Sequence, residues 1–119
     1  MKLDWVTIRV KDLEKSVKFY TEELGMEIAA RFGSPDHQIV MLGEKDQPKI
    51  ELIYEPGKIY ENPGAGVSIG LEIDGLDQLV GALKEKGHPV AGPMAPNPRV
   101  RFFFVPDPDG YSIQLVEQK

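Results

Sequence analysis

The chain of 119 residues is 41% hydrophobic and 28% charged, a composition typical of a globular protein with one domain. Its net charge of −5 argues against a nucleic-acid partner, because binding to a phosphate backbone requires a concentrated basic surface. The lack of cysteine excludes disulfides, thiolate metal sites and a cysteine nucleophile. No apolar run is long enough for a membrane span or a signal peptide, so we expect a cytoplasmic protein with no membrane partner.

The first half of the chain predicts a strand, a helix and three further strands. Residues 3–10 alternate between apolar and polar side chains, as strand residues do. Asp12 is expected to cap the helix that follows, and Gly25 to end it. The three later strands are expected at about residues 26–32, 37–42 and 49–55.

The second half predicts the same order of elements. A strand at residues 67–73 precedes a helix that Asp74 is expected to cap and Gly87 to end. A short strand at 89–91 and a proline-rich loop come next. The acidic segment 107–110, DPDG, predicts a hairpin turn rather than a calcium loop, because no carboxylate follows at the final loop position. The last two strands are expected at about residues 99–105 and 111–117.

The two halves correspond at a nearly constant offset of 63 residues, which relates Val10 to Ile73, Leu13 to Leu76 and Leu52 to Leu115, while Gly25 and Gly87 are 62 residues apart. One offset shared by strand, helix and final strand indicates an internal duplication of a βαβββ unit. We therefore predict an α+β fold in a single domain spanning residues 1–119. Its first unit is expected at about residues 1–55, its linker at 56–66 and its second unit at about 67–119.

Alternation along the strands separates an apolar face, which packs on each helix, from a second and more polar face. The polar set includes Trp5, Arg9, Glu51, Ser68 and Gln114. Such a face is either exposed to solvent or lines a cavity between two sheets. In the second case its aromatic, hydroxyl and amide groups suit a small organic ligand, and at least one phenylalanine of the segment 102–104 also faces the cavity. Arg9 either neutralises Glu51, meets an anionic ligand or is simply solvated.

The segments VTIRVKDLEKSVKFYTEELGM, IELIY and VPDPDGYSIQLVE, in this order, resemble the vicinal oxygen chelate superfamily. This superfamily includes glyoxalase I, bleomycin-resistance proteins, fosfomycin-resistance enzymes and extradiol dioxygenases. The resemblance covers nearly the whole chain. It implies a glyoxalase/bleomycin-resistance-like fold, in which duplicated βαβββ units form curved mixed sheets around a cavity. In this superfamily units pair within one chain or across a homodimer, and we expect a homodimer.

The resemblance to glyoxalase I also implies four metal-ligand positions, which fall at Trp5, Glu51, Ser68 and Gln114. Of these, only Glu51 matches the family pattern. An indole ring offers a metal no lone pair, and the serine hydroxyl and glutamine carbonyl are weak neutral donors. The two histidines of the chain lie outside these positions. We therefore predict no cofactor and no divalent metal.

Three functions remain open from the sequence. The first is a metal-independent protein that binds and sequesters a small organic molecule in a paired-sheet cavity. The second is a lyase or isomerase resembling glyoxalase I, with Glu51 as a candidate general base in a desolvated cavity, or as a residual metal ligand. Without a metal, such an enzyme lacks the strongest stabilisation of an enolate. The third is a non-catalytic interaction module whose cavity is filled by its own side chains.

Overall fold

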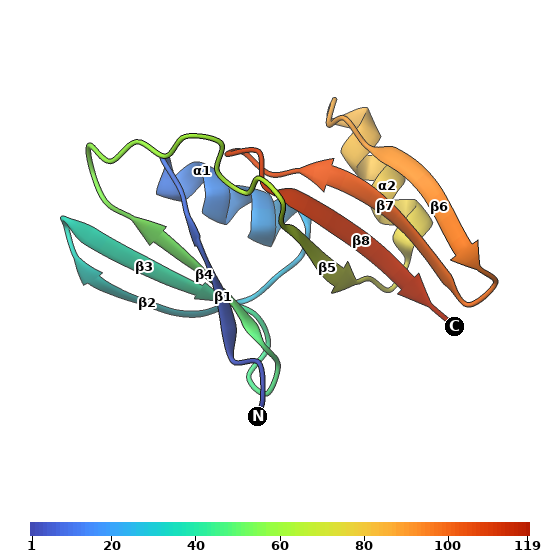
Figure 1. Cartoon of the computed structure of the whole chain (residues 1–119), viewed down its shortest axis with the longest axis horizontal. Helices are drawn as coiled ribbons and strands as arrows, with labels where there is room; N and C mark the ends of the chain where they lie inside the picture. Colours follow the sequence, from blue (N-terminus) through green and yellow to red (C-terminus); the bar gives the residue numbers. More distant parts are fainter. The chain divides into compact units, whose positions relative to one another are not determined.

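The computed structural model describes residues 1–119, which form two compact units, Met1–Pro63 and Gly64–Lys119. Each unit contains one four-stranded mixed sheet and one helical segment packed against it (Figure 1). The α+β fold of two similar units predicted from the sequence is confirmed.

The first unit has the strand order β1-β4-β3-β2, in which β1 is parallel to β4 and the other neighbours are antiparallel. Its apolar side chains Ile8, Val10, Val40, Leu42 and Leu52 are almost fully buried. The elements of this unit are β1 (Trp5–Arg9), α1 (Leu13–Lys18), η1 (Phe19–Glu23), β2 (Ile28–Ser34), β3 (His37–Leu42) and β4 (Lys49–Tyr54).

The helical segment of the first unit begins as predicted. The Asp12 carboxylate accepts a hydrogen bond from the backbone N–H of Lys15 at 3.1 Å, which satisfies one free donor of the first turn. After Lys18 the helix widens into the π-helical segment η1, which hydrophobic spacing alone does not reveal. Gly25 follows with φ +81°, a left-handed conformation that glycine adopts without strain.

The second unit has the strand order β5-β8-β7-β6, with β5 parallel to β8. Helix α2 contacts β8 and lies along one face of this sheet (Figure 1). No helix of the protein has the length and apolar character needed to cross a membrane. The elements of this unit are β5 (Ser68–Glu72), α2 (Leu76–Glu85), β6 (Ala91–Asn97), β7 (Val100–Pro106) and β8 (Ser112–Gln118).

Strand pairing repeats between the units at the offset seen in the sequence. Val6 pairs with Ile50 in the first unit, and Ile69 pairs with Ile113 in the second, so both partners are shifted by 63 residues. The parallel pair of first and last strands is therefore the same structure built twice. The most deeply buried large side chains of the second unit are Leu76, Leu83, Ile113 and Leu115.

Two sequence predictions in the second unit are wrong. Asp74 does not cap α2: the N-cap residue is Gly75 at φ +69°, and no side chain bonds to the first turn. The region expected to be a short strand at 89–91 followed by a loop is instead the seven-residue edge strand β6, which contains Pro93 and Pro96. Prolines are tolerated there because β6 pairs with β7 irregularly, with register shifts between its paired positions.

The acidic turn before the last strand has the predicted hairpin conformation. Asp107 is buried, and its carboxylate accepts hydrogen bonds from the backbone N–H groups of Asp109 and Tyr111, each at 2.9 Å. Gly110 has φ +92°, which a residue with a side chain rarely adopts. Asp107 thereby fixes the start of β8 and the side-chain alternation along it.

An ion cluster joins α2 to its sheet. The Arg101 guanidinium on β7 contacts both carboxylate oxygens of Asp77, at 2.9 and 3.0 Å, and both of Glu117 on β8, at 3.3 Å. Hydrogen bonding to Arg101 lowers the pKa of Asp77, while the two carboxylates raise the pKa of Arg101. The cluster lies on the helix side of the sheet and so helps to hold α2 in place.

We expect the Arg101→Gln variant to lose less stability in acid than the wild type does. The pKa of Asp77 is below its ordinary value of 3.8 in the folded protein. The contribution of Asp77 to the free energy of unfolding is therefore present above that value and is lost as the pH falls through the folded pKa. Urea unfolding from about pH 6 to about pH 2 measures the slope of the unfolding free energy against pH. Arg99→Gln removes the same charge outside the cluster and should keep the wild-type slope; equal slopes in all three proteins would contradict the expectation.

Candidate functional site

The first unit presents an open sheet face opposite its helical segment. Side chains of Trp5, Thr7 and Arg9 alternate along β1 with the buried residues that point to the helix. Strand register places Glu51 of β4 between Thr7 of β1 and Met41 of β3. The predicted site residues Trp5, Arg9 and Glu51 therefore share this face. Met41 and Ile53 lie on the same face and make it less polar than the sequence suggested.

The register places two aromatic residues, Trp5 of β1 and Phe32 of β2, on this face. Trp5 lies on an edge strand, and 52% of its surface is exposed. Its partner in the register is Lys49, whose ammonium group donates to the backbone carbonyls of Lys45, at 3.1 Å, and Gln47. Because this charge is bound to the preceding loop, the indole ring remains available to a planar ligand.

Glu51 is held by a neighbouring hydroxyl group. Thr7 Oγ1 donates a hydrogen bond to Glu51 Oε1 at 2.6 Å, and both side chains are partly buried. A bond this short between a hydroxyl and a carboxylate is among the stronger hydrogen bonds of proteins. Strand alternation puts Thr7 on the same face as Trp5, but it does not indicate a hydrogen bond between Thr7 and Glu51.

The second unit presents an open face of a different character. Ser68 and Gly70 of β5 pair with Ser112 and Gln114 of β8, so the predicted residues Ser68 and Gln114 share one face. A Cβ atom at Gly70 would make ordinary van der Waals contact with Gln114 Oε1 and Val116 Cγ2, each at 3.8 Å. The Gln114 amide therefore lies beside a position where the sheet carries no side chain.

The segment 102–104 divides its aromatic rings between the two faces. Phe103 is buried on the side of α2. Phe104 pairs with Gln114 and therefore shares the open face, together with Phe102 two residues away. The rings of Phe102 and Phe104 pack edge to face with centroids 5.6 Å apart. The open face of the second unit thus combines an amide, a hydroxyl and a pair of aromatic rings.

The chemistry of the four family ligand positions does not fit a divalent transition metal. Trp5 supplies no lone pair, Ser68 and Gln114 supply only weak neutral oxygens, and Glu51 already accepts a hydrogen bond from Thr7. Within either unit, no three His, Asp or Glu side chains gather as a metal site would require. A single carboxylate is a poorer donor set than the roughly three protein ligands of catalytic zinc sites.

His37 lies at the start of β3, away from these positions. Its Nδ1 atom is 3.4 Å from Glu55 Oε2, and Lys58 Nζ lies 3.8 Å from the same oxygen. Desolvation raises the pKa of Glu55, but His37, Lys58 and the hydroxyl of Tyr60 together bring it below its ordinary value. This cluster ties the beginning of the linker to β3.

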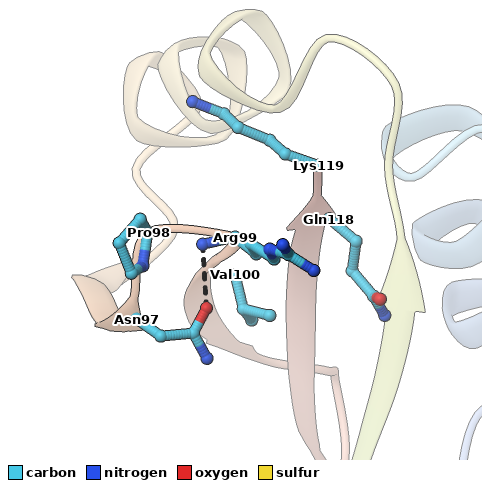
Figure 2. Close-up of a pocket in the computed structure, with 6 residues that line it drawn as sticks. All are labelled: Asn97, Pro98, Arg99, Val100, Gln118 and Lys119. Atoms are coloured by element: carbon cyan, nitrogen blue, oxygen red, sulfur yellow. Dashed lines mark hydrogen bonds between the residues drawn. The ribbon is translucent and has the colours of Figure 1, made fainter.

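A surface hollow lies at the turn between β6 and β7. Figure 2 shows the backbone N–H of Arg99 donating to Asn97 Oδ1 at 2.8 Å across this turn. The hollow contains none of the residues predicted for the ligand site. Its lining residues are Asn97, Pro98, Arg99, Val100, Gln118 and Lys119.

Comparison with known proteins identifies the family. Residues 2–115 match the model of the Glyoxalase/Bleomycin resistance protein/Dioxygenase superfamily. The chain belongs to this superfamily. Lactoylglutathione lyase of Escherichia coli O157:H7 is 34% identical, in an alignment that covers 100% of this chain and 94% of the relative. The lactoylglutathione lyase of Haemophilus influenzae is also 34% identical, with the same coverage of both chains.

Solved structures of the superfamily share the fold. Glyoxalase I of Leishmania major superposes with a TM-score of 0.84 and 30% identity, over 98% of this chain and 86% of that one. TnmS3, an antibiotic-binding protein from Streptomyces sp. CB03234, superposes with a TM-score of 0.77 and 25% identity, over 100% of this chain and 97% of that one. The similarity therefore extends both to a glyoxalase and to a protein that binds an antibiotic.

Proposed function

We propose that this glyoxalase-superfamily protein binds a small organic molecule on the open faces of its sheets and does so without a metal ion. The observation that carries the proposal is the set of side chains at the four family ligand positions. Trp5, Ser68 and Gln114 provide stacking and hydrogen-bonding groups where a metal would need anionic or imidazole donors.

The surroundings of these positions support an organic ligand. Trp5 is exposed in the first unit, and the Phe102–Phe104 pair stands beside Gln114 in the second. Aromatic surface with a few polar groups is typical of sites for small molecules. The superposition on TnmS3, whose ligand is an antibiotic, also favours binding as the function.

A lyase or isomerase activity is the second candidate, and the names of the relatives favour it. Glu51 is a carboxylate on the open face of the first unit, and a carboxylate can remove a proton next to a carbonyl group. The hydrogen bond from Thr7 fixes the direction of this carboxylate. What the site lacks is a strong electrophile to stabilise the resulting enolate, which is usually a large part of catalysis.

One experiment separates the two functions. Protein dialysed against a chelator is screened against a library of aromatic compounds by thermal shift, and against 2-oxoaldehyde–thiol adducts for turnover. We expect ligands that raise the melting temperature with or without chelator, because ligand binding to the folded state stabilises it by mass action. We expect no turnover.

The Glu51→Gln variant provides the control. If the protein is an enzyme that uses Glu51 as its base, this variant should lose about 100-fold or more of its turnover. If the protein only binds ligands, the variant should change affinity while turnover stays absent. Stoichiometric metal that is required for a reaction, in the undialysed protein, would overturn the proposed function.

A further inference from the structure

We infer that Thr7 is a positioning residue, which directs the Glu51 carboxylate toward a cationic hydrogen-bond donor on an aromatic ligand stacked at Trp5. The inference rests on the proposed function and adds to it a chemical class of ligand. It concerns the first unit alone and uses the geometry of β1 and β4.

The first step is that the two oxygens of the Glu51 carboxylate have different roles. Oε1 is occupied by the Thr7 hydroxyl at 2.6 Å. Thr7 is β-branched and lies in a strand, so few χ1 rotamers are open to its hydroxyl group. A carboxylate gripped at one oxygen by a rigid neighbour presents its other oxygen in a fixed direction, ready to accept a hydrogen bond.

The second step concerns charge. Glu51 takes part in none of the ion pairs of its unit. The ammonium of Lys49 is bound by loop carbonyls, and Arg9 is in register with Ile53 rather than with Glu51. A partly buried carboxylate that meets only a neutral hydroxyl is best completed by a donor that carries positive charge.

The third step is the position of the indole ring. Trp5 and Thr7 are two residues apart on β1, and Thr7 is in register with Glu51. From the usual spacings within and between strands, the Cα atoms of Trp5 and Glu51 lie on the order of 8 Å apart. At this separation, the indole ring of Trp5 and the carboxylate of Glu51 can both contact one ligand. A cation there also gains from the face of the tryptophan ring.

The test uses the only tryptophan of the chain as its reporter. The ¹H–¹⁵N signal of the Trp5 indole is followed in titrations with benzylammonium and with phenylacetate, which share a ring and differ in charge. We expect benzylammonium to bind at least about tenfold more tightly, the difference made by one charge-assisted hydrogen bond.

Three variants isolate the role of Thr7. Thr7→Val keeps the shape of the side chain and removes the hydroxyl, and it should weaken benzylammonium binding by about fivefold. Thr7→Ser keeps the hydroxyl and should bind within about twofold of the wild type. Thr21→Val removes a hydroxyl that donates to the carbonyl of Val17 on the helical segment, so it should leave binding unchanged. Melting temperatures of all variants show that each is folded.

The outcomes distinguish this inference from the proposed function. Equal binding of benzylammonium by the wild type and Thr7→Val overturns the positioning role, as does a preference for phenylacetate. If neutral aromatic compounds bind at Trp5 while benzylammonium does not, the ligand class is wrong and the proposed function stands. If no compound binds in either experiment, both are wrong.

Discussion

A chain with Trp5→His, Ser68→His and Gln114→Glu is expected to bind Zn²⁺ or Ni²⁺ stoichiometrically, whereas the wild type should not. Together with Glu51, the three changes supply two imidazoles and two carboxylates at the positions that the family resemblance marks as metal ligands. Such donors satisfy a divalent transition metal. We expect affinity to rise by at least about a thousandfold over the wild type, equivalent to about 4 kcal/mol. Isothermal titration and metal analysis after gel filtration measure it.

Two controls make this result interpretable. Trp5→His alone adds one donor and should bind metal only weakly, since one imidazole and one carboxylate make an incomplete site. Glu51→Gln in the triple variant removes a charged donor and should reverse most of the gain. A triple variant that folds but gains no affinity would show that the donors at these four positions do not decide metal binding by this chain.

Truncation of either repeat-related core leucine is expected to destabilise its unit strongly. Leu52 and Leu115 occupy equivalent positions of β4 and β8 and are both 0% exposed. Replacement by alanine removes buried methyl groups and leaves a cavity, which costs about 2–5 kcal/mol. Urea unfolding, followed by circular dichroism, should show a lower midpoint for Leu52→Ala and for Leu115→Ala.

Ile59→Ala is the matched control, because Ile59 is a large aliphatic residue that is 91% exposed in the linker. Its change in unfolding free energy should lie within about 0.5 kcal/mol of zero. If one core variant is as stable as this control, the equivalence of the two repeats does not extend to their packing.

The duplicated architecture could be predicted because the constraints on it are local and repeat. Burial on one strand face imposes an alternation of apolar residues, and Leu52 and Leu115 show it in both halves. The capping carboxylate of Asp12 is likewise a short-range signal, since donor and acceptor are three residues apart. The strand order could not be read from such signals, because pairing of β1 with β4 joins residues 44 apart.

The errors arose where tertiary context overrides local preference. Asp74 is a good capping residue by type, but the chain places Gly75 at the cap in a left-handed conformation. Pro93 and Pro96 argued for a loop, yet an irregular edge strand accommodates both. The π-helical segment η1 widens a helix without altering the apolar pattern on which the prediction depended.

The candidate site was accessible from the sequence only in part. Side-chain alternation correctly grouped Trp5 with Glu51, and Ser68 with Gln114, on the open faces of their own sheets. The hydrogen bond between Thr7 and Glu51 depends on the register between two strands, which the alternation does not specify. The division of Phe103 from Phe102 and Phe104 also required the register of β7 with β8.

The prolines of β6 have a consequence for the behaviour of the protein at high concentration. Pro93 and Pro96 deprive the outermost strand of two amide hydrogens, and the shifted pairing twists it away from a regular ladder. The exposed edge of β6 therefore cannot form a regular ladder of hydrogen bonds with a strand from another molecule. The protein can display the nearby aromatic rings of β7 without opening a path to amyloid-like stacking at that side of the sheet.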